Sequence, residues 1–280
     1  MLNRLQTYLQ QRTPEGIALA FSGGVDSALL LAVLSRLYKE NPFPLVALTI
    51  CSVLQDKEEM SFAEKMAQDY AVPHHFIKFN PLKIEAIKNN HTDRCYHCKK
   101  AIFTHFHEYA RQHGLKYILD GTNADDLHVY RPGQKALREL SILSPLAELG
   151  FTKAQIRRLS EELNLPTAAK PSVPCLATRF AYHTELTENN LNQVAAGEKI
   201  IHRLFPELKD FRLRLHGNLA RLEVSPKDIP ILAARANEIT NALKDLGFGF
   251  ITLDLNGFQS GSFDRNITQN SQNYYTNHYV

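Results

Sequence analysis

The chain has 280 residues, enough to bury a large hydrophobic core and to form one large domain with a smaller one. Its 32 basic residues exceed its 29 acidic residues by only three, and this net charge is too small to indicate a nucleic-acid partner by itself. No stretch approaches the roughly 18 apolar residues of a membrane span. The N-terminal residues lack the apolar segment and cleavage site of a signal peptide, so we expect a cytoplasmic protein whose thiols stay reduced.

The first informative stretch runs from an apolar segment into a small polar turn. Residues 17–21 are apolar and bounded by glycines, which predicts a short buried strand. From Ala28 onward, leucine and valine recur at intervals that predict a core helix. Between these elements, Gly23 and Gly24 can adopt positive φ angles and let the backbone approach a ligand closely.

The residues around the two glycines indicate which ligand the turn holds. Asp26 and Ser27 lie in the first turn of the predicted helix, where backbone N–H groups have no intrahelical partner and the helix dipole attracts an anion. The turn is therefore predicted to bind phosphate. It matches neither a Walker loop nor a dinucleotide-binding loop. The alternative is a plain strand-to-helix connection in which Ser22 and Ser27 act as caps.

Strands and helices alternate along the following part of the chain. The predicted strands lie at residues 45–50, 75–79 and 117–119, and the predicted helices at about residues 57–70, 81–90 and 95–113. This alternation predicts right-handed βαβ units and therefore an α/β fold with a doubly wound parallel sheet. Ligands of such sheets bind beyond the carboxyl ends of the strands, where we place the turn at 22–27, Thr49–Ser52 and Gly121–Asp126.

Beyond Pro171 the composition changes. The stretches FRLRLHG and LARLEV alternate in polarity, and residues 217–218 between them predict the turn of an antiparallel hairpin. A helix is expected over residues 225–246, followed by the strand-like FITLDL, and another helix at about 187–204 precedes the hairpin. This part is therefore predicted to be a small ββαβ module.

These patterns divide the chain into two domains and a tail. We expect the phosphate-binding domain over residues 1–170 and the second domain over residues 171–262. Residues 263–280 are polar, rich in Asn and Tyr and without periodicity, so we expect a disordered tail.

A Cys-x-x-Cys pair, Cys95 and Cys98, opens one predicted helix. Such a position lowers thiol pKa values and suits redox exchange or metal binding. A thioredoxin-like site needs a different strand context, and a zinc site needs two further ligands from His91, His97 or Cys175. An iron–sulfur cluster could use three thiolates and leave one iron open. The remaining alternative is two buried cysteines that pack as small apolar side chains.

The stretch KPSVPCLATRF holds a further cysteine in an irregular loop. Pro171 and Pro174 exclude a helix and present Cys175 on extended backbone, which predicts a chemically active thiol. Arg179 follows four residues later and can supply charge to a phosphate or lower the pKa of the thiol. Cys51, at the end of a predicted strand, is expected in the core.

The predicted hairpin offers cationic side chains. Arg212 and Arg214 are two residues apart on one strand and hence on the same face, and a guanidinium group fits phosphate well. Glu223 on the paired strand has the parity to join or orient them. The alternative is a solvated charged face of the sheet. Lys209 and Arg221 are expected to be solvated.

Five stretches together resemble a known family: SGGVDS, RCYHCKKAIF, DGTNADD, SPLAELGFTKAQIRRLSEELNLP and KPSVPCLATRF. The first resembles the loop of the ATP-pyrophosphatase (PP-loop) superfamily, whose members cleave ATP between the α and β phosphates. In this order and spacing, the five resemble the LarE family of sulfur transferases, which act in the synthesis of the nickel-pincer nucleotide cofactor of lactate racemase. The resemblance covers about residues 10–260.

The resemblance implies an ATP site at the turn, with Mg²⁺ near the catalytic residue Asp26. The residues implied around the nucleotide are Ser22, Gly23, Gly24, Ser27, Gly121 and Asp125. The implied substrate is a pyridinium mononucleotide with two carboxylates, each activated as a mixed anhydride with AMP, because a bare carboxylate is a poor electrophile. The residues implied at its phosphate are Arg179, Arg212, Arg214 and Glu223.

The resemblance implies two alternative sulfur sources. In single-cysteine members, the cysteine that matches Cys175 gives up its sulfur and becomes dehydroalanine. In three-cysteine members, three thiolates hold a 4Fe-4S cluster whose open iron carries the transferable sulfide. This chain has Cys95, Cys98 and Cys175 at the matching positions, so the resemblance favours the cluster.

The remaining expectations concern partners. Family members form hexamers, so the resemblance implies a homo-oligomer that acts on a small-molecule nucleotide. A tRNA thiolase is the main alternative, since the same loop and cysteines would suit it, although such an enzyme normally carries a broader basic surface. A metal-storage or regulatory protein with an inert loop is the non-enzymatic alternative, which an ATP-binding assay distinguishes.

Overall fold

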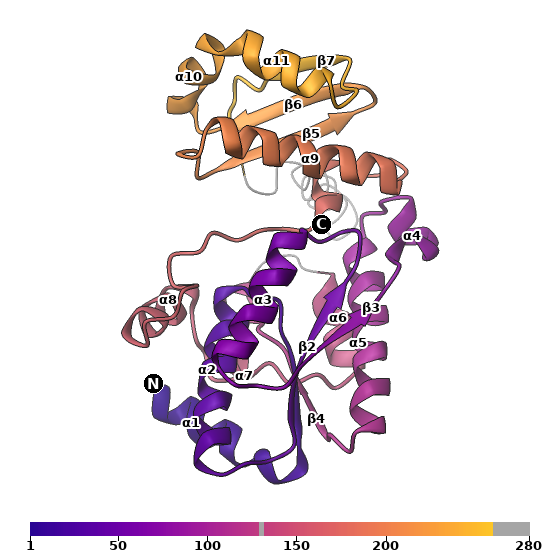
Figure 1. The fold of residues 1–280 in the computed structure, drawn as a ribbon. Helices are drawn as coiled ribbons and strands as arrows, with labels where there is room; N and C mark the ends of the chain where they lie inside the picture. Colours follow the sequence, from indigo (N-terminus) through magenta and orange to yellow (C-terminus); the bar gives the residue numbers. More distant parts are fainter. Residues whose placement is uncertain (129–131, 260–280) are drawn as a thin grey trace, which may run out of the picture. The chain divides into compact units, whose positions relative to one another are not determined.

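The structure, a computed structural model, describes residues 1–128 and 132–259. The chain forms two compact units (Figure 1). Of the described residues, the first unit contains 1–87, 92–128 and 132–175, and the second contains 88–91 and 176–259. The tail predicted at 263–280 lies outside the described residues. Among the residues described, no helix combines the length and the apolar character that crossing a membrane requires.

The first unit is built on a four-stranded parallel sheet with the strand order β3-β2-β1-β4 (Figure 1). The strands are β1 (Ile17–Ala20), β2 (Leu45–Cys51), β3 (His74–Lys78) and β4 (Tyr117–Leu119). Strand β1 runs parallel to both of its neighbours, and β3 runs parallel to β2. The predicted α/β fold with a parallel sheet is therefore confirmed, and its central strand β1 leads directly into the glycine turn.

Helices cover both faces of this sheet. On β1, Ile17 and Leu19 belong to one buried cluster and Ala18 to the other, because alternate side chains of a strand point to opposite faces. The first cluster contains side chains of α1 (Leu2–Gln10), α2 (Val25–Glu40), α3 (Lys57–Asp69) and α8 (Lys153–Glu162). The second contains side chains of α5 (Arg94–Gln112) and α6 (Gly133–Glu139). The strand before the turn therefore packs into both cores, and the helix after the turn packs into the first.

Short elements complete the first unit. They are the 3-10 turns η1 (Thr13–Glu15) and η3 (Asp125–His128) and the helix α7 (Pro145–Glu148). The single helix predicted at 81–90 is wrong, since the chain forms η2 (Pro81–Lys83) and then α4 (Glu85–Lys88). Ile84 between them is extended, with φ −101° and ψ 116°, which interrupts the helical hydrogen bonds.

The second unit contains a three-stranded sheet in the order β5-β6-β7. The strands are β5 (Phe211–His216), β6 (Leu219–Val224) and β7 (Phe250–Leu253). Strands β5 and β6 form the predicted antiparallel hairpin, and Gly217 in its turn has φ +61°. Strand β7 pairs parallel to β6, which confirms the predicted ββαβ order.

The helices of the second unit differ in one respect from the prediction. The single helix expected over 225–246 is divided into η5 (Pro226–Asp228), α10 (Ile229–Ala234) and α11 (Ala236–Lys244), because Arg235 leaves the helical conformation with φ −109° and ψ 26°. The helix predicted at 187–204 is present as α9 (Glu188–Leu204), preceded by η4 (Leu176–Arg179). Gly197 lets α9 approach the sheet, since a Cβ there would lie 2.7 Å from Leu213.

Candidate active site

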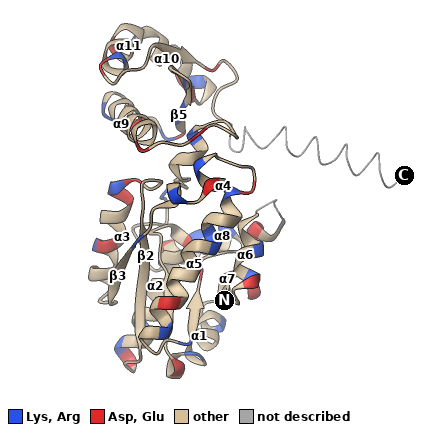
Figure 2. Cartoon of the chain, turned by 90° about the vertical axis from the view of Figure 1, so that its right-hand side faces the viewer, with Lys and Arg blue, Asp and Glu red and all other residues tan. Residues whose placement is uncertain are grey.

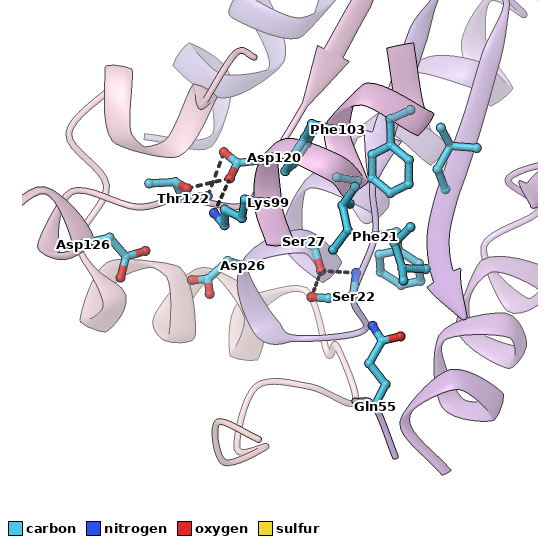
Figure 3. Close-up of a pocket in the computed structure, with 16 residues that line it drawn as sticks. Phe21, Ser22, Asp26, Ser27, Gln55, Lys99, Phe103, Asp120, Thr122 and Asp126 are labelled. Atoms are coloured by element: carbon cyan, nitrogen blue, oxygen red, sulfur yellow. Dashed lines mark hydrogen bonds and ion pairs between the residues drawn. The ribbon is translucent and has the colours of Figure 1, made fainter. Parts of the chain in front are cut away.

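A cavity of about 300 Å³ lies at the carboxyl ends of the strands in the first unit (Figure 3). Its apolar wall consists of Ala20, Phe21, Leu48, Ile50, Ile102, Phe103 and Phe106. The rest of the lining is mostly polar and consists of Ser22, Asp26, Ser27, Gln55, Lys99, Asp120, Gly121, Thr122 and Asp126. An apolar wall beside a few convergent polar groups is typical of a small-ligand site, and this end of a parallel sheet is where such ligands bind.

The turn between β1 and α2 has the geometry of an anion site. Gly24 is the N-cap of α2, so the first N–H groups of the helix have no intrahelical partner. Gly23 has φ +71°, a conformation that favours glycine. The hydroxyl of Ser27 donates to the Gly24 carbonyl at 3.1 Å and lies 3.2 Å from the hydroxyl of Ser22. These contacts fix the backbone at the position that the sequence predicted to bind phosphate.

Gly121 brings the end of β4 against this turn. A Cβ at Gly121 would lie 3.0 Å from the backbone nitrogen of Ser27 and 3.2 Å from the Cβ of Asp26. A side chain at this position would force one of the two backbone segments to move. The structure therefore places Gly121 beside the turn, as the sequence predicts.

Asp26 lies at the cavity with both carboxylate oxygens engaged. Its Oδ2 accepts a hydrogen bond from the ammonium group of Lys153 at 2.5 Å, and its Oδ1 accepts one from the amide of Asn123 at 3.3 Å. An ammonium group on this carboxylate shows that a cation fits there. Mg²⁺ in nucleotide sites is typically held by one or two carboxylates together with phosphates. Asp26 therefore fits the role of a magnesium ligand.

Asp120 organises a second polar group at the cavity. Its buried carboxylate accepts hydrogen bonds from the hydroxyls of Thr122 and Ser144, both at 2.6 Å, and the ammonium of Lys99 lies 3.5 Å away (Figure 3). Sequence reasoning missed Asp120, Lys99 and also Lys153. A signal existed for Asp120, which directly follows a predicted strand, whereas only packing brings Lys99 and Lys153 to the cavity.

Asp125, expected beside the nucleotide, makes a different contact. Its exposed carboxylate accepts a hydrogen bond at 2.7 Å from the backbone N–H of Lys153, the first residue of α8. The neighbouring Asp126 lines the cavity, and its carboxylate accepts the N–H of Asn123 at 3.1 Å. Asp125 thus joins the loop after β4 to the helix that supplies Lys153.

Cys98 has two other cysteines of the first unit, Cys95 and Cys175, near its thiol. Cys95 and Cys175 are exposed, and Cys98 on α5 is partly buried. Burial, together with the nearby Cys175 and Cys95 thiols, raises the pKa of Cys98 to about 12. Cys95 and Cys175 therefore both lie near enough to Cys98 to affect its thiol. Cys51, expected in the core, is partly buried at the end of β2.

The zinc alternative gains no support from the histidines named for it. His97 pairs with Asp93, with 3.2 Å between Nε2 and Oδ2. His91 belongs to the second unit, where its ring lies 5.7 Å from that of His183. Within residues 1–128 and 132–259, no three His, Cys, Asp or Glu side chains are arranged to hold a single metal ion.

The second unit gathers the predicted arginines around two glutamates. Arg214 donates to Glu223 through Nε at 3.0 Å and Nη2 at 2.9 Å. Arg179 makes the same two-bond contact with Glu198, at 3.0 and 2.9 Å. The side chains of both arginines are almost completely buried. Glu198 was missed by sequence reasoning, because no periodicity relates a residue of α9 to Arg179.

Arg221 was expected to be solvated, and this prediction is wrong. Its side chain is only 28% exposed, and its Nη2 donates to Glu223 at 2.8 Å. Its Nε also lies 3.6 Å from Asp254. Arg221 and Glu223 are two residues apart on β6 and therefore share a face, which lets the buried glutamate accept a hydrogen bond from this second arginine.

Arg212 differs from the other arginines of this group. Its Nη1 donates to the carbonyl of Phe211 at 2.7 Å, and its guanidinium lies 5.0 Å from the centre of the Phe258 ring. Burial, followed by the charges of Arg179 and Arg214, lowers the pKa of Arg212 to about 10. A neighbouring anion would favour the charged form of this guanidinium.

The sequence is similar to several known proteins. The asparagine synthase family matches residues 7–219. An uncharacterized protein of Synechocystis is 36% identical over 253 residues, which cover 90% of this chain and 92% of that protein. The pyridinium-3,5-bisthiocarboxylic acid mononucleotide synthase of Lactiplantibacillus plantarum is 34% identical over 255 residues, or 90% of each chain. A tRNA-specific 2-thiouridylase of Thermoanaerobacter is 29% identical over 201 residues, covering 55% of this chain and 53% of that protein. The chain therefore belongs to the asparagine synthase family of PP-loop ATP pyrophosphatases and is a homologue of LarE, the pyridinium bisthiocarboxylic acid mononucleotide synthase.

Proposed function

We propose that this protein is an ATP-dependent sulfur transferase of the LarE type. Its reaction would convert the carboxylates of a pyridinium biscarboxylic acid mononucleotide into thiocarboxylates. The observation that carries this proposal is the similarity to the Lactiplantibacillus synthase, which extends along 90% of both chains. The name of that relative states the product.

The first unit would perform the adenylylation. The adenosine of ATP fits the apolar wall of the cavity, and its phosphates fit the turn near Ser22, Gly24 and Ser27, where free N–H groups and the helix dipole attract anions. A carboxylate oxygen of the substrate attacks the α phosphorus, the bond from this phosphorus to the bridging oxygen breaks, and pyrophosphate leaves. The acyl adenylate is a better electrophile than the carboxylate because AMP can leave with the electron pair.

Charged side chains at the cavity suit the pyrophosphate group. Asp26 would hold Mg²⁺, which supplies charge neutralisation when bound. Two lysines lie where a lysine can contact phosphate oxygens. They are Lys153, which pairs with Asp26, and Lys99, which lies near Asp120. Both ammonium groups are partly exposed, so a nucleotide can reach them.

Cys95, Cys98 and Cys175 would hold a 4Fe-4S cluster. Support comes from the Cys95 and Cys175 thiols near Cys98, which add to the effect of burial in raising the pKa of Cys98. A cation bound at these thiols would offset this effect and favour the thiolate form. When bound, such a cluster supplies an open iron for the transferable sulfide. The alternative is that Cys175, which is exposed, gives up its own sulfur.

The second unit would bind the phosphate of the substrate. Arg212 is the suitable ligand, because burial and then the neighbouring positive charges lower its pKa, and an anion would favour its charged form. Arg179 pairs with Glu198, and Arg214 pairs with Glu223. We therefore assign these two arginines to the charged surroundings of Arg212 instead of to direct contact with the phosphate.

A tRNA thiolase is the weaker candidate. The tRNA-specific relative covers about half of this chain, whereas the mononucleotide synthase covers 90% of it. In the view of Figure 2, basic and acidic residues are interspersed over the helices of the first unit, unlike the basic stripe that a polyanion requires.

Two measurements test the proposed function. Given ATP and the biscarboxylated mononucleotide, the protein should release pyrophosphate and form a thiocarboxylate, which mass spectrometry identifies. The visible spectrum of anaerobically purified protein should show the broad brown absorption of a cluster, and Cys95→Ala should remove it. Absence of pyrophosphate release contradicts the enzyme assignment, and a colourless protein that binds one zinc ion contradicts the cluster.

We also propose a homo-oligomer, a hexamer by resemblance to the family. Light scattering should then give a particle mass well above the 31.8 kDa of one chain. A monomer at micromolar concentration contradicts this proposal.

A further inference from the structure

Lys170 plays no part in the reaction described above, yet its side chain reaches the turn. Its ammonium group donates to the carbonyl of Gly23 at 3.3 Å and to the carboxylate of Glu59 at 2.8 Å. It also lies 3.8 Å from the centre of the Phe62 ring, a cation–π contact. The Lys170 side chain is only 17% exposed, so these three partners hold the ammonium in one place.

The backbone of Lys170 is fixed separately from its side chain. Arg157 of α8 donates to the carbonyls of Ala168 at 2.6 Å and of Lys170 at 3.0 Å. The N–H of Lys170 donates to the carbonyl of Thr167 at 3.0 Å. A lysine whose backbone and ammonium are both held can act as a rigid contact to the turn.

One face of α3 holds both the ammonium and the turn. Glu59, Phe62 and Ala63 are three and four residues apart and therefore lie on the same side of the helix. Glu59 and Phe62 contact Lys170, while a Cβ at Gly23 would lie 3.3 Å from the Cβ of Ala63. The Gly23 backbone and the Lys170 ammonium are therefore fixed to a common support.

The Gly23–Gly24 peptide is the part of the turn with the greatest freedom. Neither residue has a Cβ, so this peptide can rotate to the opposite orientation at little steric cost. In a trans peptide the C=O and N–H groups point in opposite directions. Lys170 holds the Gly23 carbonyl, and the Gly24 N–H donates to the hydroxyl of Ser22, which lines the cavity, at 3.4 Å. The reversed peptide would turn its carbonyl oxygen to the side of the Ser22 hydroxyl and repel a phosphate bound there.

We propose that Lys170 is a positioning residue that holds the Gly23–Gly24 peptide with its N–H group toward the nucleotide. The inference rests on the proposed binding of ATP at the turn. In this proposal, the contact of Lys170 with the Gly23 carbonyl controls the direction of the Gly24 N–H on the other side of the same peptide. Lys170 acts by fixing the position of the Gly23 carbonyl.

Two variants separate this role from a simple effect of positive charge. Lys170→Met removes the contact to Gly23, and we expect the dissociation constant of ATP to rise about tenfold, the effect of losing one well-placed donor to a charged group. Glu59→Gln keeps Lys170 but weakens the contact that holds its ammonium group, and we expect the dissociation constant of ATP to rise about threefold. If Lys170 acted only through its charge, removing the negative Glu59 would instead lower the dissociation constant of ATP.

Calorimetry with the full-length protein measures these constants, and thermal melting checks that each variant folds. Lys116→Met is the matched control, because Lys116 pairs with Glu15 before the start of β4, at the opposite end of the sheet, and its loss should leave ATP binding unchanged. Unchanged binding in Lys170→Met, or tighter binding in Glu59→Gln, overturns the proposal while leaving the ATP site in place. A wild-type protein that does not bind ATP overturns the proposed function itself.

Discussion

The ammonium of Lys153 lies 2.5 Å from the carboxylate of Asp26, and the backbone N–H of the same lysine donates to Asp125. The first residue of α8 therefore connects the PP-loop with the loop after β4. The pair is partly buried, with the Asp26 side chain 20% exposed, so its attraction is screened less than that of a surface pair. The negative charge of Asp26 is thus balanced by Lys153, and a metal ion has to share or displace this lysine.

Asp26→Asn keeps the size of the side chain and removes its charge. We expect pyrophosphate release to fall on the order of a hundredfold, because the metal loses a ligand where charge develops on the phosphates. The circular dichroism spectrum should stay that of the wild type, since Asp26 is not part of a core cluster. Undiminished release would show that Asp26 is not the metal ligand.

Gly121→Ala tests the close approach of β4 to the turn. The added methyl group would lie 3.0 Å from the nitrogen of Ser27, and we expect a loss of about 1–3 kcal/mol in the free energy of unfolding, together with weaker ATP binding. Gly114→Ala is the control: its φ is +66° but no atom lies within 4 Å, so it strains the backbone without disturbing the turn. Equal ATP affinity in Gly121→Ala and the wild type would contradict the assignment.

Sequence patterns predicted the elements better than the contacts between them. Alternating strands and helices located the sheet, and the glycines located the turn, because both signals are local. The pairs Lys153–Asp26 and Arg179–Glu198 join segments that only tertiary packing brings together, and periodicity describes the faces of a single element. The break at Arg235 was missed for a related reason, since the helical pattern continues on both sides of it.

Arg212→Ala should weaken binding of the substrate mononucleotide about tenfold or more while the dissociation constant of ATP stays within about twofold. The reason is that Arg212 belongs to the second unit and the ATP cavity to the first. Titration calorimetry with each nucleotide separates the two effects. A parallel loss of both affinities would mean that Arg212 supports the fold instead of the substrate.

Arg214→Ala is expected to behave differently. Arg214 and its partner Glu223 are both buried, and removing the arginine leaves a buried carboxylate with reduced compensation. We expect a loss of roughly 3 kcal/mol in the free energy of unfolding, measured by chemical denaturation. Wild-type stability would show that Arg221 alone compensates Glu223.

His74 makes stability depend on pH in the acidic range. Its Nε2 lies 2.8 Å from the hydroxyl of Thr49, which donates to the carbonyl of Phe21 just before the turn. Burial lowers the pKa of His74, so the unfolded chain binds a proton more readily than the folded one below about pH 6.5. The free energy of unfolding should therefore fall as the pH drops through this range, and it should fall less in the His74→Gln variant. Denaturation curves at pH 7 and pH 5 that shift equally in both proteins would exclude this contribution.

The source of the sulfur decides how many turnovers one protein can perform. If Cys95, Cys98 and Cys175 hold a cluster, each thiolate is a ligand and none is consumed, so added sulfide should support several turnovers in anaerobic protein. If Cys175 is the donor, its sulfur displaces AMP to form a thioester, a base removes the Cα proton, and the Cβ–S bond breaks. The products are then a thiocarboxylate and dehydroalanine, and turnover stops near one per chain.

Mass spectrometry of the protein after reaction distinguishes these outcomes at one residue. Loss of the mass of H₂S at Cys175 would identify sacrificial donation, whereas intact Cys175 with several turnovers identifies the cluster. Cys98→Ser is the informative variant, because Cys98 is the most buried of the three thiols and Cys175 influences its pKa directly. Its loss should abolish multiple turnovers if the cluster is the source, since two thiolates no longer suffice to hold it with one iron left open. Under sacrificial donation, Cys98→Ser should still complete one turnover, and that single turnover would exclude the cluster mechanism.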